Sequence, residues 1–253
     1  MNISKAIVRV PPENFSQGIT TSGLGKPDYE LTLKHHKEYC QALKNCGLNL
    51  IILEKDPDFP DSAFVEDTAV VNEKCAVITR PGDMRRRGEE KKIEKVLSKY
   101  RDIERIKKPG TVDGGDVLRV HNKYYIGLSQ RTNKEGGAQL SEILKKHGFE
   151  SVFVKVSGML HLKSGVNYLD RGVIIIREEI SDLTYFKNLH KITVNPRESY
   201  AANCIFMNGL VFMPAGFPET SKKIESAGFN IIELQMSEFE KMDGGVSCLS
   251  IRF

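Results

Sequence analysis

The sequence predicts an α/β fold in which five units of ββαβ type are arranged like propeller blades around a central axis. Two observations predict this fold. Five stretches each begin with polar or small residues and continue into an apolar strand: FVEDTAVV (64–71), TVDGGDVLRV (111–120), LHLKSGVNYL (160–169), YAANCIFMNGLVFM (200–213) and GGVSCLSIRF (244–253). One polar residue of each stretch recurs at intervals of 46, 48, 42 and 45 residues, namely Asp67, Asp113, His161, Asn203 and Cys248. Such a period indicates a repeated supersecondary unit.

The other segments of each unit follow in a constant order. A second apolar strand is expected at 75–80, 124–129 and 172–177. Apolar residues at helical spacing then predict helices at 89–100, 137–148 and 221–229. A third strand is expected at 151–156 and 230–235. The last unit is expected to be completed by N-terminal segments: a strand at 5–10, a helix within 26–47 and a strand at 48–54.

This arrangement predicts one central site. If every unit begins at the same end of the axis, the five recurring polar residues meet there although they are far apart in the sequence. No stretch rich in Gly, Ser and Pro divides the chain, so residues 1–253 are predicted to form a single domain.

The composition narrows the class of protein. It is 40% hydrophobic and 28% charged, which is typical of a globular chain. The net charge of +4 is mild and the basic clusters at 84–87 and 90–92 are short, so no nucleic-acid partner is expected. No apolar run is long enough to cross a membrane and the N-terminus lacks the apolar core of a signal peptide. A cytoplasmic protein without a membrane partner is therefore expected.

The cysteines point to reduced thiols. There are five of them, an odd number, and none forms a CxxC pair, which argues against a structural zinc site. Cys248 differs from the others because it follows the turn Asp243-Gly244-Gly245 and lies in what is predicted to be a short strand. Taken alone it could still be a buried structural thiol.

The residues expected at the axis combine three chemistries. A cysteine is a nucleophile once a positive charge lowers its pKa, and either a protonated His161 or a cationic substrate could supply that charge. Asp113 could orient the imidazole, although an Asp-Gly-Gly sequence also suits a plain turn. Glu66 and Asp67 have no fixed basic partner in the expected site, which favours a planar cation such as guanidinium.

Seven motifs, in this order, carry a family resemblance: FVEDTAVV, ITRPG, DGGDV, GLSQRTN, LHLKSG, YAANCI and DGGVSC. They resemble the dimethylargininases (dimethylarginine dimethylaminohydrolases), which belong to the guanidine-modifying superfamily with the five-bladed α/β propeller called the pentein fold. The resemblance extends over nearly the whole chain. It implies hydrolysis of Nω-methylated arginine to citrulline and an amine, without a cofactor or metal.

The resemblance also implies residue roles. Cys248 matches the nucleophile, His161 the general acid and base, and Asp113 the carboxylate that orients the histidine. The implied substrate contacts are Glu66 and Asp67 at the guanidinium, Arg86 and Arg131 at the α-carboxylate, Asp61 at the α-amino group, Ile19 in an apolar lid, and Met242 and Asp243 through the main chain. A homodimer is the expected assembly.

Three alternatives remain open at this stage. An arginine deiminase or an amidinotransferase would use the same site, and Lys163 stands where deiminases carry an aspartate that holds guanidinium, which favours a methylated substrate. A non-catalytic binding protein with the same fold is the third. The choice of Arg86 over Arg85 and Arg87 rests on an ungapped match alone. Inhibitory zinc at Cys248 and His161 is also left open.

Overall fold

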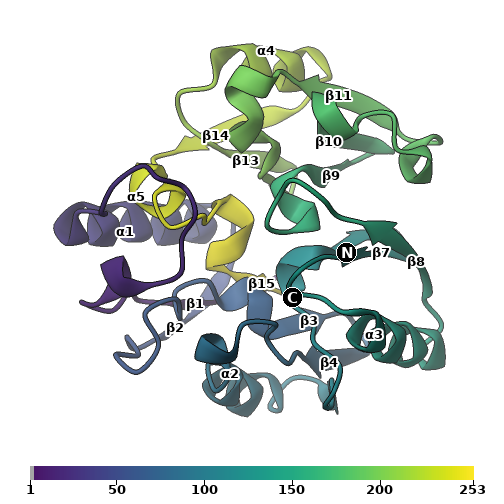
Figure 1. Cartoon of the computed structure of the whole chain (residues 1–253). Helices are drawn as coiled ribbons and strands as arrows, with labels where there is room; N and C mark the ends of the chain where they lie inside the picture. Colours follow the sequence, from purple (N-terminus) through teal and green to yellow (C-terminus); the bar gives the residue numbers. More distant parts are fainter. Residues whose placement is uncertain (1–2) are drawn as a thin grey trace.

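Five three-stranded sheets surround a central axis in the computed structural model, which describes residues 3–253 (Figure 1). In the order in which neighbouring strands pair, the sheets are β15 (Ile251–Arg252), β1 (Lys5–Arg9) and β2 (Asn49–Leu53); β3 (Ala69–Val71), β4 (Cys75–Ile78) and β5 (Asp102–Arg105); β6 (Val117–Val120), β7 (Lys123–Leu128) and β8 (Glu150–Lys155); β9 (Val166–Asp170), β10 (Val173–Arg177) and β11 (His190–Val194); and β12 (Ile205–Met207), β13 (Leu210–Pro214) and β14 (Asn230–Leu234).

Each sheet repeats one pattern of strand pairing. The first two strands are antiparallel and the second and third are parallel, as in β6, β7 and β8. Parallel neighbours need a crossover connection, usually a helix. Four crossovers contain one: α1 (Tyr29–Asn45), α2 (Glu90–Leu97), α3 (Lys134–Lys146) and α4 (Pro218–Ser226). The predicted fold of five ββαβ-type units is thereby confirmed.

The fourth unit departs from the pattern. Between β10 and β11 the chain forms two short 3-10 helices, Glu178–Ile180 and Thr184–Phe186, in place of an α-helix. Phe186 is the one residue that these two 3-10 helices bury. A four-residue helix, α5 (Ser237–Glu240), follows β14.

Two of the helices, α1 and α3, begin at side-chain caps. The carboxylate of Asp28 accepts a hydrogen bond from the amide of Leu31 at the start of α1, and the side chain of Asn133 accepts one from Gly136 at the start of α3. Each helix then buries one apolar face against its own sheet. In α2 that face is formed by Ile93 and Leu97, which are fully buried.

The two ends of the chain close the ring. Strand β15 pairs with β1, with Ala6 opposite Arg252 and Ile7 opposite Ile251. The last motif of the sequence is therefore held in the same sheet as the first strand, and this places Cys248 beside the other four units.

The polar beginnings of the five stretches form short 3-10 turns at the axis. They are η2 (Val65–Thr68), η4 (Gly114–Asp116), η5 (Leu162–Ser164), η8 (Pro196–Ala202) and η9 (Val246–Leu249), and each directly precedes the first strand of a sheet. The prediction that Cys248 lies in a strand is thus wrong. Its amide donates to the carbonyl of Gly245 at 3.1 Å, a local bond that a strand ladder would not make.

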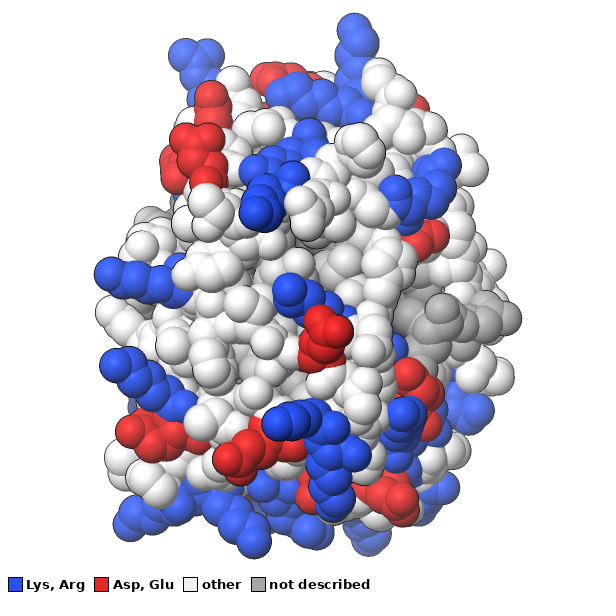
Figure 2. Space-filling model, turned by 90° about the vertical axis from the view of Figure 1, so that its right-hand side faces the viewer, with Lys and Arg blue, Asp and Glu red and all other residues white. Residues whose placement is uncertain are grey.

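The surface carries mixed charge. On the face in Figure 2, Lys and Arg side chains are interspersed with Asp and Glu. No helix among residues 3–253 is both long and apolar enough to cross a membrane.

Candidate active site

A small cavity lies at one end of the axis, where the 3-10 turns meet. Its volume, taken as the space open to the centre of a water-sized sphere, is about 20 Å³. Twelve residues line it: Ile19, Asp61, Phe64, Asp67, Arg86, Arg131, Leu160, His161, Met242, Asp243, Gly244 and Cys248. Nine of the eleven residues predicted for the site are among them. The exceptions are Asp113, which lies behind His161, and Glu66, which faces away from this cavity.

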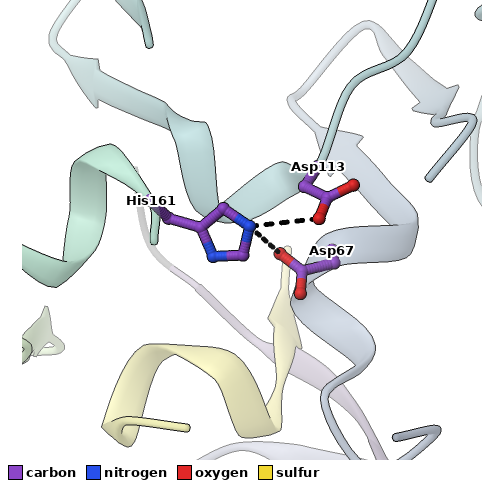
Figure 3. Close-up of side chains that lie close together, drawn as sticks. All are labelled: Asp67, Asp113 and His161. Carbon is purple, nitrogen blue, oxygen red and sulfur yellow. Dashed lines mark hydrogen bonds and ion pairs between the residues drawn. The ribbon is translucent and has the colours of Figure 1, made fainter. Parts of the chain in front are cut away.

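His161 is held by a buried carboxylate. Its Nε2 atom lies 3.1 Å from Oδ2 of Asp113 and 4.0 Å from Oδ1 of Asp67 (Figure 3). Asp113 is fully buried and is fixed in turn by the amide of Gly82, which donates to its Oδ1 at 2.8 Å. Within residues 3–253, Nδ1 of His161 has no hydrogen-bond partner. Because Nε2 faces Asp113, Nδ1 is the atom that can exchange a proton with a ligand.

The charges around His161 favour imidazolium. Burial lowers the pKa of a histidine, but the carboxylates of Asp67, Asp113 and Asp116 outweigh this and raise the pKa of His161 to about 9. At neutral pH the ring therefore carries two protons. Nε2–H donates to Asp113, and Nδ1–H is available as a general acid.

Cys248 is held as a neutral thiol. Burial raises its pKa to about 12, with Glu66 and Asp67 acting in the same direction. The amide of Gly245, which donates to Sγ at 3.3 Å, and the ammonium of Lys163 act against them. The cavity thus needs an added positive charge before it can hold a thiolate.

Arg86 occupies a different environment from the one predicted. Its Nη1 atom lies 2.6 Å from Oδ2 of Asp67, and its Nη2 atom lies 2.8 Å from Glu89 and 3.0 Å from the carbonyl of Phe64. Arg86 is only 5% exposed, so most of its donors are used by the protein. Asp67 therefore has a fixed basic partner, contrary to the sequence-based expectation. Although burial raises the pKa of Asp67, His161 and Arg86 outweigh it and hold that pKa below its usual range.

Glu66 also has fixed basic partners, contrary to the expectation from the sequence. Its Oε1 atom forms an ion pair with Nζ of Lys163 at 2.7 Å and accepts a hydrogen bond from Nη2 of Arg252 at 2.9 Å. These three residues line a second, larger cavity on the axis that lacks Cys248 and His161. Lys163 therefore does not face the cavity with Cys248, and the expectation that it weakens binding of unmethylated arginine has no support in this geometry.

The loop that carries Ile19 covers the cavity. Both carboxylate oxygens of Asp61 lie 3.1 Å from the amide of Ile19. Gly18 packs so closely on Asp61 that a Cβ there would be 2.5 Å from Oδ1. Further along the loop, the amide of Thr21 donates to Oδ2 of Asp243 at 2.5 Å. Burial raises the pKa of Asp61, and Arg86 and the amide of Ile19 only partly offset it.

The predicted main-chain contacts lie beside this loop. Met242 is 2% exposed, and Asp243 adopts a φ of 58°, which turns the chain toward Gly244 and Gly245. Arg131 lines the opposite wall, with Nη1 3.8 Å from Oδ2 of Asp113. Its guanidinium is the least committed positive charge in the cavity wall, because no shorter ion pair holds it among the described residues.

One group of side chains in the described range could offer ligand atoms to a cation. Asp67, Asp113 and His161 place theirs within 4.8 Å of one another (Figure 3). Arg86 already neutralises Asp67, and Arg131 lies beside Asp113. With these charges and a histidine that favours imidazolium, the group suits a guanidinium contact better than a metal ion.

Sequence reasoning missed three cavity residues. Phe64 and Leu160 stand three and one positions before Asp67 and His161, and Gly244 belongs to a turn that was noted only as a turn. Gly244 is required there, since a Cβ would be 2.1 Å from the ring of Phe64. Apolar residues just ahead of the recurring polar positions were the available signal.

Comparisons with known proteins identify a matching family and similar enzymes. The family described as "N,N dimethylarginine dimethylhydrolase, eukaryotic" matches residues 21–193. The N(G),N(G)-dimethylarginine dimethylaminohydrolase of Pseudomonas aeruginosa is 44% identical over 98% of each chain. The enzyme of that name from Streptomyces coelicolor is 34% identical, over 100% of this chain and 98% of its own.

Solved structures with the same fold superpose on this chain. A Pseudomonas aeruginosa DDAH variant in complex with citrulline superposes with a TM-score of 0.98, at 43% identity and over the full length of both chains. The N-terminal domain of ArgZ, a cyanobacterial arginine dihydrolase, has a TM-score of 0.89 over 100% of this chain and 97% of its own. At 19% identity it shows the shared fold alone.

The fold and the cysteine, histidine and aspartates at its axis define a hydrolase of the pentein class. Within that class, the chain belongs to the dimethylarginine dimethylaminohydrolase family.

Proposed function

We propose that the chain hydrolyses Nω-methylated arginines, both asymmetric dimethylarginine and monomethylarginine, to citrulline and dimethylamine or methylamine. The observation that carries this proposal is that Cys248 and His161 line one covered cavity with Asp67, while Asp113 orients the histidine. The printed names of the two bacterial relatives, and the citrulline bound to one of them, support the same substrate class.

Substrate binding activates the nucleophile. A guanidinium placed against Asp67 brings a positive charge next to Sγ of Cys248, and this lowers the thiol pKa from its raised value. The thiol proton leaves to solvent. The resting thiol is thereby protected from non-specific reaction until the cationic substrate arrives.

The first step forms a covalent intermediate. The thiolate of Cys248 attacks the guanidinium carbon, and the bond from that carbon to the methylated nitrogen breaks. The departing amine takes the proton on Nδ1 of His161, whose other nitrogen stays on Asp113. An S-alkylthiouronium remains on Cys248.

The second step is hydrolysis. A water molecule attacks the thiouronium carbon and gives a proton to the now neutral His161. The carbon–sulfur bond then breaks, the second proton of the water is lost from the new hydroxyl, citrulline forms and the thiol is restored. Asp113 stabilises the imidazolium formed in this step.

The remaining cavity residues hold the amino-acid end of the substrate. Arg131 is the residue we propose for the α-carboxylate, with Arg86 contributing charge from behind Asp67. Asp61 receives the α-amino group together with Ile19, and the main chain at Met242 and Asp243 completes the wall. Glu66 is further back and acts on the guanidinium only through its charge.

Three further proposals concern the whole protein. We propose that it acts in the cytoplasm, as a homodimer, and that residues 1–253 form one catalytic domain. Light scattering of the purified protein distinguishes a dimer from a monomer, and limited proteolysis tests for a second domain.

A citrulline assay tests the proposed activity. The purified protein is incubated separately with asymmetric dimethylarginine, monomethylarginine and arginine, and Cys248→Ser serves as the control. Citrulline from the two methylated substrates, absent in the variant, is the expected result. Citrulline mainly from arginine makes the protein a deiminase, and none from any substrate rejects the hydrolase function.

A further inference from the structure

Ser247, the residue before the proposed nucleophile, is held at every polar atom. It is 1% exposed. Its hydroxyl donates to Oε2 of Glu66 at 2.7 Å, and its amide donates to Oδ1 of Asn203 at 2.9 Å. Its carbonyl accepts from Nη1 of Arg252 at 3.0 Å.

The three partners come from three different units of the ring. Glu66 belongs to η2 ahead of β3, Asn203 precedes β12, and Arg252 is in β15. Glu66 is itself fixed by Lys163, which belongs to η5. Ser247 therefore joins the turn that carries Cys248 to two other units of the propeller, through Glu66 and Asn203, while Arg252 belongs to the same unit as Ser247.

These hydrogen bonds of Ser247 determine where Sγ of Cys248 points. The turn from Gly245 to Cys248 is closed by the bond from the Cys248 amide to the Gly245 carbonyl at 3.1 Å, and the Gly245 amide donates to Sγ at 3.3 Å. Asn203 packs directly on Gly245, where a Cβ would be 2.3 Å from its side chain. A rotation of the turn about Ser247 would move Sγ away from the cavity.

We propose that Ser247 is a positioning residue for the reaction: its hydroxyl, bonded to Glu66, fixes the η9 turn so that Cys248 faces the guanidinium carbon. The proposal rests on the proposed function. It assigns Glu66 a task at the back of the turn, since its carboxylate is bonded there by Ser247, Lys163 and Arg252. Placement errors of about 1 Å at a reacting atom cost about 100-fold in rate.

The test replaces Ser247 and a matched serine. Ser247→Ala is expected to lower kcat for dimethylarginine by about 10-fold to 100-fold and to change KM by less than about threefold, because the cavity wall keeps its shape. Ser221→Ala is the control. Ser221 is also buried and loses a hydrogen bond of 3.0 Å to Oε1 of Glu233, but it belongs to α4 and, among the described residues, shares no hydrogen-bond partner with the turn from Gly245 to Cys248. Its kcat is expected to stay within about twofold.

Crystal structures of the wild type and of Ser247→Ala give a second measurement, which does not depend on turnover. The expected result is a Cys248 Sγ atom displaced by about 1 Å or occupying two positions. If Ser247→Ala does not fold, Asn203→Ala, which frees the Ser247 amide, is expected to show the same two effects.

The outcomes separate the two proposals. An Sγ position and a kcat that both match the wild type overturn the role of Ser247. An equal loss of kcat in Ser221→Ala also overturns it, because the effect would then be general destabilisation. If the wild type forms no citrulline, the proposed function fails, and the crystal structures alone decide whether Ser247 positions Cys248.

Discussion

The Nε2 atom of His161 lies 3.1 Å from Oδ2 of Asp113, although 48 residues separate them in the sequence. The two residues lie at the starts of two adjacent units, directly before η4 and η5. Both side chains are buried, so water does not compete for the bond. The bond leaves Nδ1 as the nitrogen for proton transfer, and the catalytic role that we propose for the histidine depends on it.

Asp113→Asn tests that dependence. The amide has the same shape but no charge, so it neither stabilises the imidazolium nor selects the productive tautomer. We expect kcat to fall by about 100-fold or more with KM nearly unchanged, as measured by citrulline formation. Asp113→Glu keeps the charge and is expected to retain more activity. If Asp113→Asn and the wild type had equal activity, Asp113 would serve only to hold the turn.

The stability of the fold is expected to fall with rising pH because of His161. Its pKa is raised from 6.5 to about 9 in the folded state, against the effect of burial and through Asp67, Asp113 and Asp116. The folded protein therefore binds this proton more tightly. The contribution is fully present below pH 6.5 and is lost as the pH rises through about 9. It amounts to at most about 3 kcal/mol.

Urea denaturation of the wild type and of His161→Gln over this pH range measures the contribution. Both proteins keep Cys248 and the other titrating groups, so the difference between them isolates the histidine. The free energy of unfolding of His161→Gln is expected to fall less than that of the wild type between the lower and the upper end of this pH range. Parallel pH profiles would show that His161 is not charged in the folded protein.

Arg86 and Arg85 are expected to differ sharply when each is replaced by glutamine. Arg86 is buried between Asp67 and Glu89, whereas Arg85 is exposed and, among residues 3–253, pairs only with Asp83. Removing Arg86 leaves two buried carboxylates without their partner, which costs about 3–5 kcal/mol in the free energy of unfolding. Arg85→Gln should change it by about 0.5 kcal/mol or less. Equal effects in a denaturation experiment would contradict the buried ion-pair network.

The repeat explains why the sequence predicts so much of this fold. Asp67, Asp113, His161, Asn203 and Cys248 recur because each unit presents its start to the same axis, and spacing along the chain records that directly. The closure of the ring by β15 and β1 followed from the unit that the N-terminus completes. The resemblance then supplied the residues of the cavity wall.

Side-chain direction and partner choice could not be predicted in the same way. Glu66 and Asp67 are neighbours in the sequence, yet the 3-10 turn η2 sends one to Lys163 and Arg252 and the other to Arg86. A pattern of strand starts implies alternation and gives no sign of such a turn. Ion pairs across units depend on packing that local sequence does not contain.

The most direct test of the mechanism is mass spectrometry of the acid-quenched reaction. Dimethylarginine and monomethylarginine are mixed separately with the wild type for a single turnover, and the cysteine-containing peptides are compared. We expect one adduct, of the same mass from both substrates, on the peptide that contains Cys248, because the methylated nitrogen leaves before the quench. An adduct that keeps its methyl groups, an adduct on another cysteine, or citrulline formed with no adduct at any time would contradict nucleophilic attack by Cys248.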